Sequence, residues 1–493
     1  MYPISRESLI AFLETDVELS EYAEYDALGI ANLIRKKEIK PDEVIETCHR
    51  AIEKVNPKIN AVIGTIDPVN ENFETNPNAP LFGVPFLLKD LNHGYAGVQC
   101  DMGSRLAQGY VFKNDSDLAK RFKSSGLVAV GRSNTPEFGL SGTTETILHG
   151  ASRNPWNTEL TTGGSSGGAA AAVAAGIVPV AHASDGGGSI RIPAAWTGLI
   201  GHKPSRGLIP KGPMSSDGTN WLSVHFVVSK TVRDTAAMMD ALVGPALGDY
   251  IHVPKPATSF LRRMQTEPRG LRIALCAELD DGPSTHPDCR AAVQSAARLC
   301  EQLGHVVKEA KPAISCIKTF RVGYNLFLPG LVKLIDKLSR VMGRAIGPGT
   351  LEAISLAAYE SEKTIQKEKF LSDLEEVNTL SRVMGEFMAD YDILLQPAVT
   401  CPPFEVGVKN PNRELPTGFD YWAEEIEYFT TSPLFNITGQ PTMSLPLFWN
   451  DDLPLGVQFT ASIGNDVLLF QLAHQLEQIS PWFYKRPSVH VAR

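Results

Sequence analysis

Short apolar strands alternate with amphipathic helices along much of this chain. The candidate strands lie at residues 61–63, 84–88, 127–131 and 271–276, and the candidate helices at 27–55, 116–125 and 286–303. Strands that are apolar at successive positions are buried on both faces, and the helices between them supply the cover. The alternation therefore predicts an α/β fold in which a sheet is covered by helices on both faces.

Two stretches depart from this alternation. Glycine and small residues dominate from 161 to 207, whereas 317–429 is mostly helical in pattern and rich in Lys and Glu. We interpret the second stretch as an insertion over one face of the sheet. Strand character returns at 393–395 and 457–459, and a helix is expected at 466–478. Asn56-Pro57 is expected to end the early helix, because a residue before proline avoids the α region.

The composition describes a chain that can bury a large core. It has 493 residues, 43% of them hydrophobic and 20% charged, with a net charge of −9. An acidic chain without a basic cluster is a poor nucleic-acid binder. Its seven cysteines are scattered, and the apolar run at 169–180 is too short to span a bilayer. We therefore expect a cytoplasmic protein, with no nucleic-acid or membrane partner.

Two glycine-rich turns carry serines. One is Gly163-Gly164-Ser165-Ser166-Gly167-Gly168, followed by an alanine-rich helix, and the other is Asp185-Gly186-Gly187-Gly188-Ser189-Ile190-Arg191. Glycines leave backbone N–H groups accessible, and a serine beside such donors suits acyl transfer, where charge develops on a carbonyl oxygen. Either turn alone could equally be a tight turn that needs positive φ.

Motifs typical of nucleotide-binding and zinc-binding proteins are absent from the sequence. The chain has no phosphate-binding G-x-x-x-x-G-K-[ST] run, no G-x-G-x-x-G in either turn, and no zinc-type H-E-x-x-H or paired C-x-x-C. We expect no metal site. Gly164–Gly168 does fit G-x-S-x-G, which keeps open an α/β-hydrolase-type esterase with Ser166 as its nucleophile, although the upstream segment is loop-like.

A lysine ends the apolar strand at 84–88. Lysine is rarely buried unless it is paired, and desolvation lowers the pKa of an amine, so a buried Lys89 could accept a proton. The alternative interpretation is a surface lysine at a strand end, paired with Asp90.

Together these segments resemble the amidase signature family. Its pattern combines a lysine after an apolar strand, a G-G-S-S-G-G turn and a G-G-S-I-R turn. The resemblance runs from about residue 25 to 480, and further family segments match at 134–138, 154–156, 192–194, 201–207, 436–441 and 453–458. It implies one large domain, 1–493, with a central mixed, twisted sheet, preceded by an N-terminal extension at 1–25.

The resemblance also implies roles for single residues. Ser189 would be the nucleophile, Ser165 the bridging serine after a cis peptide bond, and Lys89 the base. The N–H groups of Gly186, Gly187, Gly188 and Ser189 would form the oxyanion hole, while Ser166, Asp185 and Arg191 would support the turns. No metal or organic cofactor is implied. Within the family, residues 182–188 and 203–207 look most like the bacterial amidases that include 6-aminohexanoate-cyclic-dimer hydrolase.

Substrate contacts are expected from two places. Aromatic side chains of the helical stretch are candidates to line the cleft, namely Tyr324, Phe327, Tyr421, Trp422, Tyr428 and Phe429. The loop Phe138-Gly139-Leu140 lies where family members line the acyl pocket. The leading function is hydrolysis of a small carboxylic amide through a serine acyl-enzyme. An amidotransferase A-type subunit of a transamidation complex and a catalytically idle binding protein are the alternatives, and a homodimer is left open.

Overall fold

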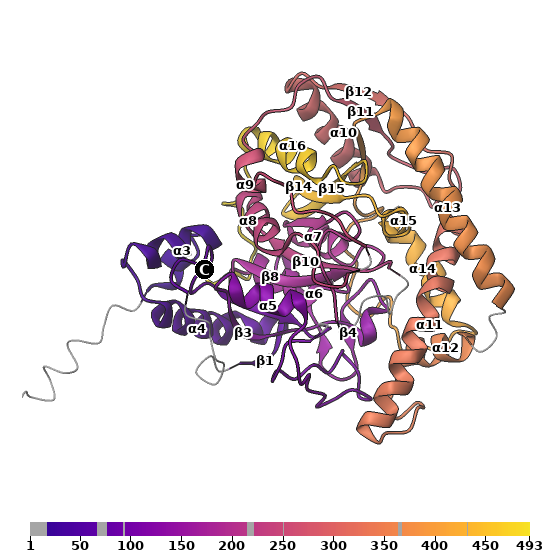
Figure 1. The fold of residues 1–493 in the computed structure, drawn as a ribbon, viewed down its shortest axis with the longest axis horizontal. Coiled ribbons are helices and arrows are strands. Elements are labelled where there is room, and N and C mark those ends of the chain that lie inside the picture. Colours follow the sequence, from indigo (N-terminus) through magenta and orange to yellow (C-terminus); the bar gives the residue numbers. More distant parts are fainter. Residues whose placement is uncertain are drawn as a thin grey trace, which may run out of the picture.

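The computed structural model describes residues 17–66, 76–91, 94–213, 221–249, 251–362, 367–430 and 432–493. An 11-stranded sheet runs through the molecule in the order β1-β3-β2-β8-β10-β9-β14-β15-β13-β11-β12 (Figure 1). Its strands are β1 (Val62–Thr65), β2 (Pro85–Lys89), β3 (Val128–Ser133), β8 (Val180–Asp185), β9 (Ile200–Lys203), β10 (Val224–Ser229), β11 (Arg272–Leu275), β12 (Val306–Glu309), β13 (Ile393–Pro397), β14 (Thr442–Asn450) and β15 (Leu453–Ala461).

The sheet is mixed. β2 pairs in parallel with β3 and β8, and β11 pairs in parallel with β12 and β13. The remaining pairs are antiparallel. Two small two-stranded sheets lie outside it and are formed by β4 (Glu145–Thr146), β5 (Gly150–Ala151), β6 (Arg153–Asn154) and β7 (Asn157–Thr161). The predicted α/β fold with a mixed central sheet is confirmed.

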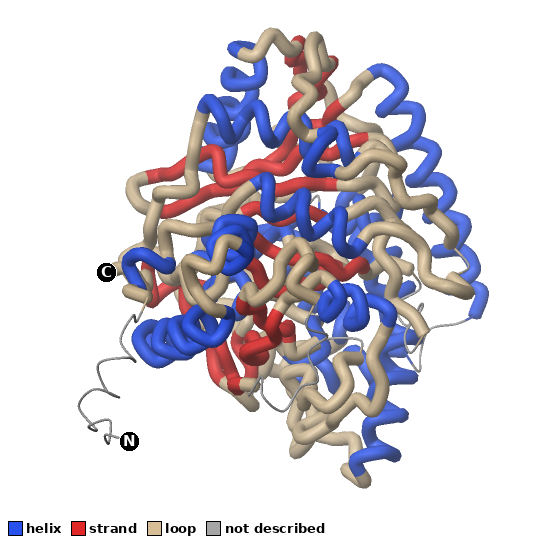
Figure 2. Tube along the Cα trace, turned by 60° about the vertical axis from the view of Figure 1, so that its left-hand side comes forward, coloured by secondary structure: helices blue, strands red, loops and turns tan. Residues whose placement is uncertain are grey.

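Helices cover both faces of the sheet (Figure 2). α6 (Gly167–Ala174) and α7 (Arg191–Thr197) contact each other and the central strands, while α8 (Val232–Leu242), α10 (Pro287–Gln302) and α16 (Asp466–Ile479) form another layer. All eight residues of α6 are buried, as expected of a helix that is apolar all round. The smaller helices are α2 (Leu19–Tyr22), α3 (Ala27–Arg35), α5 (Asp117–Ser124), α9 (Phe260–Arg263), α15 (Ser432–Thr438) and the 3₁₀ turn η2 (Glu137–Gly139).

The early helix continues past the proline that was expected to end it. α4 spans Pro41–Ile59 and ends at Asn60, which adopts a left-handed conformation. Pro57 lies in the last turn, so its missing N–H removes one hydrogen bond near a terminus rather than breaking the helix. Val55 and Ile59 are buried against the core, and this packing favours the extra turn.

The helical stretch is not one continuous insertion. α11 (Cys316–Met342), α12 (Ala353–Glu362), α13 (Lys367–Asp390) and α14 (Gly418–Phe429) are interrupted by β13, which lies inside the central sheet. Much of the expected N-terminal extension lies outside the described residues. Its last part packs on the body, because Tyr22 is buried and donates a hydrogen bond to the carbonyl of Ile177 at 2.9 Å. Among the described residues, the helices are all too short or too polar to span a bilayer.

Candidate active site

The register of two parallel strands brings the candidate lysine to the glycine-rich turns. Phe86 of β2 lies opposite Val180 of β8, and Leu87 opposite Ala181. Parallel strands end at the same edge of a sheet, so Lys89 at the end of β2 lies beside Ser184 and Asp185 at the end of β8. The second turn begins directly after Asp185.

Lys89 is fully buried among hydroxyl groups. Its Nζ lies 2.7 Å from Oγ of Ser165 and 2.9 Å from Oγ of both Ser166 and Ser184. Burial lowers the pKa of Lys89 to about 7, against the opposing effect of the Asp185 charge. A neutral amine keeps two N–H donors and one lone pair, so this site can hold the lysine as a proton acceptor.

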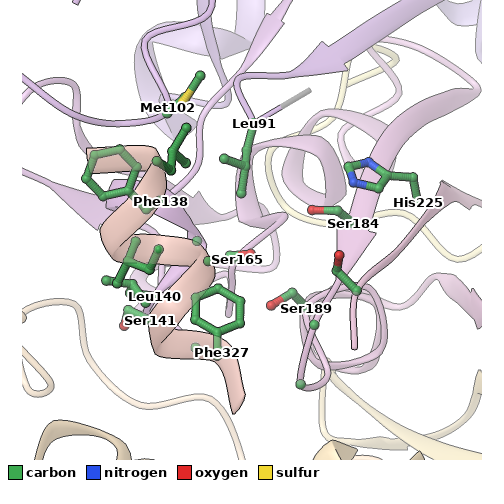
Figure 3. Close-up of a pocket in the computed structure, with 18 of the residues that line it drawn as sticks. Leu91, Met102, Phe138, Leu140, Ser141, Ser165, Ser184, Ser189, His225 and Phe327 are labelled. Atoms are coloured by element: carbon green, nitrogen blue, oxygen red, sulfur yellow. The ribbon is translucent and has the colours of Figure 1, made fainter. Parts of the chain in front are cut away.

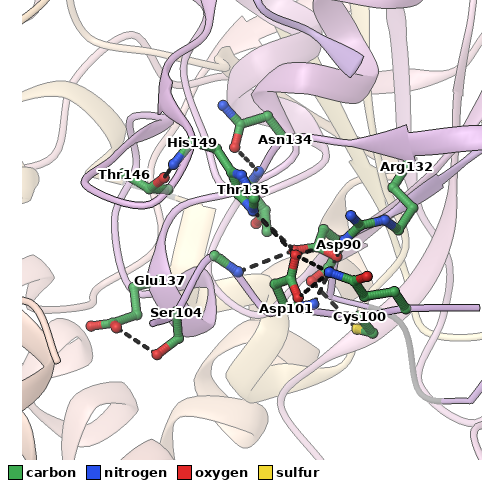
Figure 4. A network of polar contacts seen from close by, with 12 residues as sticks. Asp90, Cys100, Asp101, Ser104, Arg132, Asn134, Thr135, Glu137, Thr146 and His149 are labelled. Carbon is green, nitrogen blue, oxygen red and sulfur yellow. Dashed lines mark hydrogen bonds and ion pairs between the residues drawn. The ribbon is translucent and has the colours of Figure 1, made fainter. Parts of the chain in front are cut away.

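Asp90 does not pair with Lys89. Its carboxylate turns away and accepts a hydrogen bond from Arg132 at 2.7 Å and from the backbone N–H of Asp101 at 2.9 Å (Figure 4). Asp90, Asp101 and His149 have ligand-type atoms within 4.8 Å of one another. The guanidinium of Arg132 bridges the two carboxylates, at 2.7 and 2.9 Å, so this cluster already holds its cation.

The first glycine-rich turn presents Ser165 to the lysine. The Gly164–Ser165 peptide bond is cis, and the Ser165 carbonyl accepts a hydrogen bond from Thr135 Oγ1 at 2.9 Å. Gly139 lies so close that a Cβ there would be 3.2 Å from Ser165 Oγ. The N–H of Ser166 donates to the carbonyl of Ser189 at 3.2 Å, which ties the two turns together.

A buried ion pair fixes the second turn. Arg191 donates from Nε and one terminal nitrogen to the Asp185 carboxylate, each at 2.9 Å. Burial opposes ionisation of Asp185, but the charge and hydrogen bonds of Arg191 hold its pKa at about 2. Asn436 completes the cluster by donating to Asp185 Oδ1 at 3.0 Å and accepting from Arg191 at 2.8 Å.

Three of the four predicted oxyanion donors are available. Within the described part of the chain, the backbone N–H groups of Gly186, Gly187 and Ser189 have no protein acceptor. The N–H of Gly188 instead donates to Asp185 Oδ1 at 2.7 Å. The prediction for Gly188 is therefore wrong: its amide holds the turn in shape, and its φ of 129° suits glycine.

The esterase alternative with Ser166 does not fit this geometry. Ser166 is fully buried, accepts from Lys89 and donates to the carbonyl of Ser184 at 3.2 Å. β7, which precedes its turn, pairs with β6 outside the central sheet, whereas a nucleophile elbow follows a strand of the main sheet. The Ser166 hydroxyl instead links Lys89 to the carbonyl of Ser184.

A cavity of about 640 Å³ opens onto Ser165, Ser184 and Ser189 (Figure 3). Its wall is mostly apolar and includes six of the nine predicted substrate residues: Phe138, Gly139, Leu140, Phe327, Trp422 and Phe429. Lys333 and Lys337 of α11 also line it.

Three of the proposed aromatic contacts lie elsewhere. Tyr324 packs behind the wall, with its ring 5.5 Å from Phe419 and 5.2 Å from Trp422. The Tyr421 hydroxyl bonds to the backbone of Arg413, and the Tyr428 ring stacks on Trp196 at 5.9 Å. The expectation that these tyrosines line the cleft is wrong, because aromatic residues at helical spacing also serve the core.

Four polar residues of this site were missed in the sequence. Ser184 contacts Lys89, Asn436 supports Asp185, and His225 and Glu425 line the cavity. Burial raises the pKa of Glu425 to about 7, although its carboxylate accepts the Gly142 N–H at 2.7 Å. Ser184 precedes Asp185 in the segment 182–188, and Asn436 begins the segment 436–441; both segments are recognisable in the sequence, but neither residue is marked by its local pattern.

Known proteins resemble this chain over most of its length. A family model described as Amidase matches residues 43–470. The 6-aminohexanoate-cyclic-dimer hydrolase of Paenarthrobacter ureafaciens is 33% identical over 481 residues, which cover 94% of this chain and 96% of that protein.

Two solved structures extend the comparison. A 6-aminohexanoate cyclic dimer hydrolase complexed with substrate superposes with a TM-score of 0.89 and 31% identity, over 95% of this chain and 99% of that one. A bacterial aryl acylamidase of the amidase signature family superposes with a TM-score of 0.83 and 26% identity, over 94% and 98%.

Proposed function

The chain belongs to the amidase signature family and is an amide hydrolase, and from this premise we propose that Lys89, Ser165 and Ser189 are its catalytic residues. The observation that carries the proposal is the 2.7 Å contact between Lys89 Nζ and Ser165 Oγ in a buried site. Asp185 is the carboxylate whose charge acts on the pKa of Lys89, but it forms its ion pair with Arg191.

The hydrogen bonds around Lys89 support proton transfer from Ser165 to the lysine. Ser166 Oγ donates to the Ser184 carbonyl and so accepts from Lys89. A neutral Lys89 would then donate to Ser166 and Ser184 and accept the proton of Ser165. Ser165 in turn takes the proton of Ser189 as Ser189 Oγ attacks the amide carbon.

The free amides of the second turn complete the reaction. The N–H groups of Gly186, Gly187 and Ser189 would stabilise the oxyanion, and a missing donor of this kind typically costs about 3–4 kcal/mol in the barrier. The relay then runs backwards and protonates the leaving amine. Water attacks the acyl-enzyme by the same route and releases the carboxylic acid.

The cavity supports a substrate with a sizeable apolar part. Its volume of about 640 Å³ and its aliphatic and aromatic wall fit an amide with an extended or cyclic apolar chain. The hydrolase of similar sequence and fold acts on the cyclic dimer of 6-aminohexanoate by its name, and a cyclic diamide of this kind is our first candidate substrate.

The other functions have less support. A transamidation subunit would need an acyl acceptor other than water, and both relatives named above are hydrolases. An idle binding protein would not need an unpaired buried lysine beside a relay of hydroxyls. We further propose a cytoplasmic location, supported by seven cysteines without a disulfide. A homodimer stays a prediction.

A panel of aryl, aliphatic and cyclic amides tests the proposal. The purified chain should release amine without ATP, and Lys89→Ala should abolish turnover. Lys230→Ala is the control, because Lys230 is partly buried and packs over Phe483 away from the cavity. Failure of every amide, or full activity in Lys89→Ala, would contradict the proposal.

A further inference from the structure

Two lysines of α11 lie at the reaction cavity and have no role in the relay described above. Lys333 and Lys337 both line the cavity, and both are exposed to solvent. They are four positions apart on one helix, so their side chains project from the same face, where like charges repel. Glu425, an acidic residue of the same cavity, comes from α14 and accepts the N–H of Gly142 at 2.7 Å.

Neither ammonium group is paired within the part of the chain that the structure describes. Lys318, the other lysine of α11, forms an ion pair with Glu376 at 2.7 Å. Asp336 lies between Lys333 and Lys337 in the sequence, but its carboxylate accepts a hydrogen bond from the Tyr359 hydroxyl at 2.8 Å. The two ammonium groups at the cavity can therefore bind an anion that the protein itself does not supply.

The end of α11 and the residues that follow it are positively charged in an acidic chain. Residues 333–344 contain two lysines and two arginines against one carboxylate, whereas the whole chain has a net charge of −9. Charge of one sign at a cleft raises the local concentration of ligands of the opposite sign. This segment therefore favours anionic ligands at its side of the cavity.

The helix also sets the distance from these lysines to the reaction centre. The ring of Phe327 points into the cavity, and a Cβ on Gly186 of the second glycine-rich turn would lie 3.7 Å from that ring (Figure 3). With a rise of about 1.5 Å per residue, Lys333 and Lys337 follow Phe327 by about 9 and 15 Å along the helix axis. An extended chain advances about 1.2 Å per bond, so these lengths correspond to roughly seven to twelve bonds.

We propose that Lys333 and Lys337 are substrate-binding residues that take a carboxylate at the far end of an open-chain amide, about seven to twelve bonds from the scissile carbonyl. Leu331 and Leu334 of the same helix line the cavity and would pack on the chain between the two ends. The proposal rests on the proposed function and adds a class of substrate to it. A neutral cyclic diamide has no group for these lysines.

The kinetic test compares two amides of equal chain length, one that ends in a carboxylate and one that ends in a hydroxymethyl group. The wild type should have the higher kcat/KM for the carboxylate. Lys333→Gln and Lys337→Gln should each raise KM for that amide about threefold, and the double variant about tenfold, since solvent partly screens exposed ion pairs. Because binding of a remote group is equal in ground and transition states, kcat should change less than about twofold. KM for the hydroxymethyl amide should stay within about twofold of the wild type in all three variants.

Arg340→Gln is the matched control. Arg340 is an exposed cation of the same helix and lies outside the described lining of the cavity, so its loss changes the net charge without removing a contact. It should leave KM for both amides within about twofold of the wild type. The advantage of the carboxylate should disappear when the chain is shortened below about four bonds, and it should decrease as the salt concentration rises.

Three results would overturn the proposal. One is equal kcat/KM for the two amides in the wild type at every chain length, and another is a preference for the carboxylate that survives in the double variant. The third is an equal effect of Arg340→Gln and the double variant, because the substrate would then respond only to overall charge. If the wild type cleaves neither amide at any chain length, it is the proposed function that fails.

Discussion

The two sides of the cavity are built on different principles. On the side of the sheet, Lys89, the two serine turns and the Asp185–Arg191 pair engage one another through short hydrogen bonds, and the side chains of the lysine and the ion pair are fully buried. The opposite wall is made by α11 and α14, where ring contacts such as Phe327 with Trp422 at 5.8 Å predominate. Hydrogen bonds on the first side depend on the residue type and on bond angles, whereas apolar packing on the second side depends only on the volume and shape of the side chains.

Two hydroxyls that contact Lys89, those of Ser165 and Ser184, should differ most in their effect on catalysis. Ser165→Ala should lower kcat about 10⁴-fold, because it removes the proposed proton path from Ser189 to Lys89. Ser184→Ala should lower kcat about tenfold, the effect of one lost hydrogen bond to Lys89. Steady-state kinetics with thermal melting as the folding control will show this. Losses of equal size would mean that Ser165 relays no proton.

The buried Asp185–Arg191 ion pair should matter far more than the exposed Arg272–Asp392 pair at the start of β11. Arg191→Met leaves Asp185 charged and buried without its partner, and should lower the free energy of unfolding by about 3–5 kcal/mol. Arg272→Met is the control, because Arg272 is about half exposed and pairs with Asp392 at 2.9 Å. Urea denaturation should show a much smaller loss for this variant, because solvent screens an exposed ion pair. Comparable losses would contradict the difference between the two regions.

The pH dependence should follow the lysine. Burial lowers the pKa of Lys89 to about 7, and only the neutral amine accepts a proton, so kcat/KM should rise about tenfold per pH unit below 7 and level off above it. Burial also raises the pKa of Glu425 to about 7, so the carboxyl loses its proton in the same pH range and must be tested separately. Glu425→Gln keeps an acceptor for the Gly142 N–H and should retain the rising limb. Loss of that limb in this variant would assign it to Glu425 instead.

Substitutions in the wall should have the smallest and most selective effects. Trp422→Ala enlarges the cavity and should raise KM about tenfold for a bulky apolar amide, with kcat changed less than about threefold, because the removed contacts are equal in ground and transition states. A short aliphatic amide serves as the control substrate and should be unaffected. A large loss in kcat for both substrates would mean that the wall also aligns the relay.

The contrast between the two sides explains what the sequence could predict. The turns at 163–168 and 185–191 are recognisable because few residue types meet their backbone and hydrogen-bond demands. Gly188 was assigned to the wrong role because sequence does not tell whether an N–H points to substrate or to Asp185. Tyr324 was misplaced because an aromatic residue of an amphipathic helix can face either the cavity or the core, and only the packing of α11 on its neighbours decides.

Long-range partners lay beyond the local patterns. Asn436 reaches Asp185 across 251 positions of the chain. The strand at 393–395 is predicted from its own residues, but its place in the sheet between β15 and β11 is not. The strand alternation predicted the covered sheet, because it depends on burial of whole elements, whereas the mixed pairing was expected from the family resemblance. Contacts between distant elements depend on tertiary packing, and local patterns in one sequence do not reveal it.

Covalent trapping tests the central claim most directly. The wild type, mixed with a slowly deacylated activated amide and quenched, should carry one acyl group on Ser189 in a peptide map, and Lys89→Ala should carry none although it melts as a folded protein. An acyl group on Ser165 or Ser166, or equally fast labelling of Lys89→Ala, would contradict the lysine-driven relay.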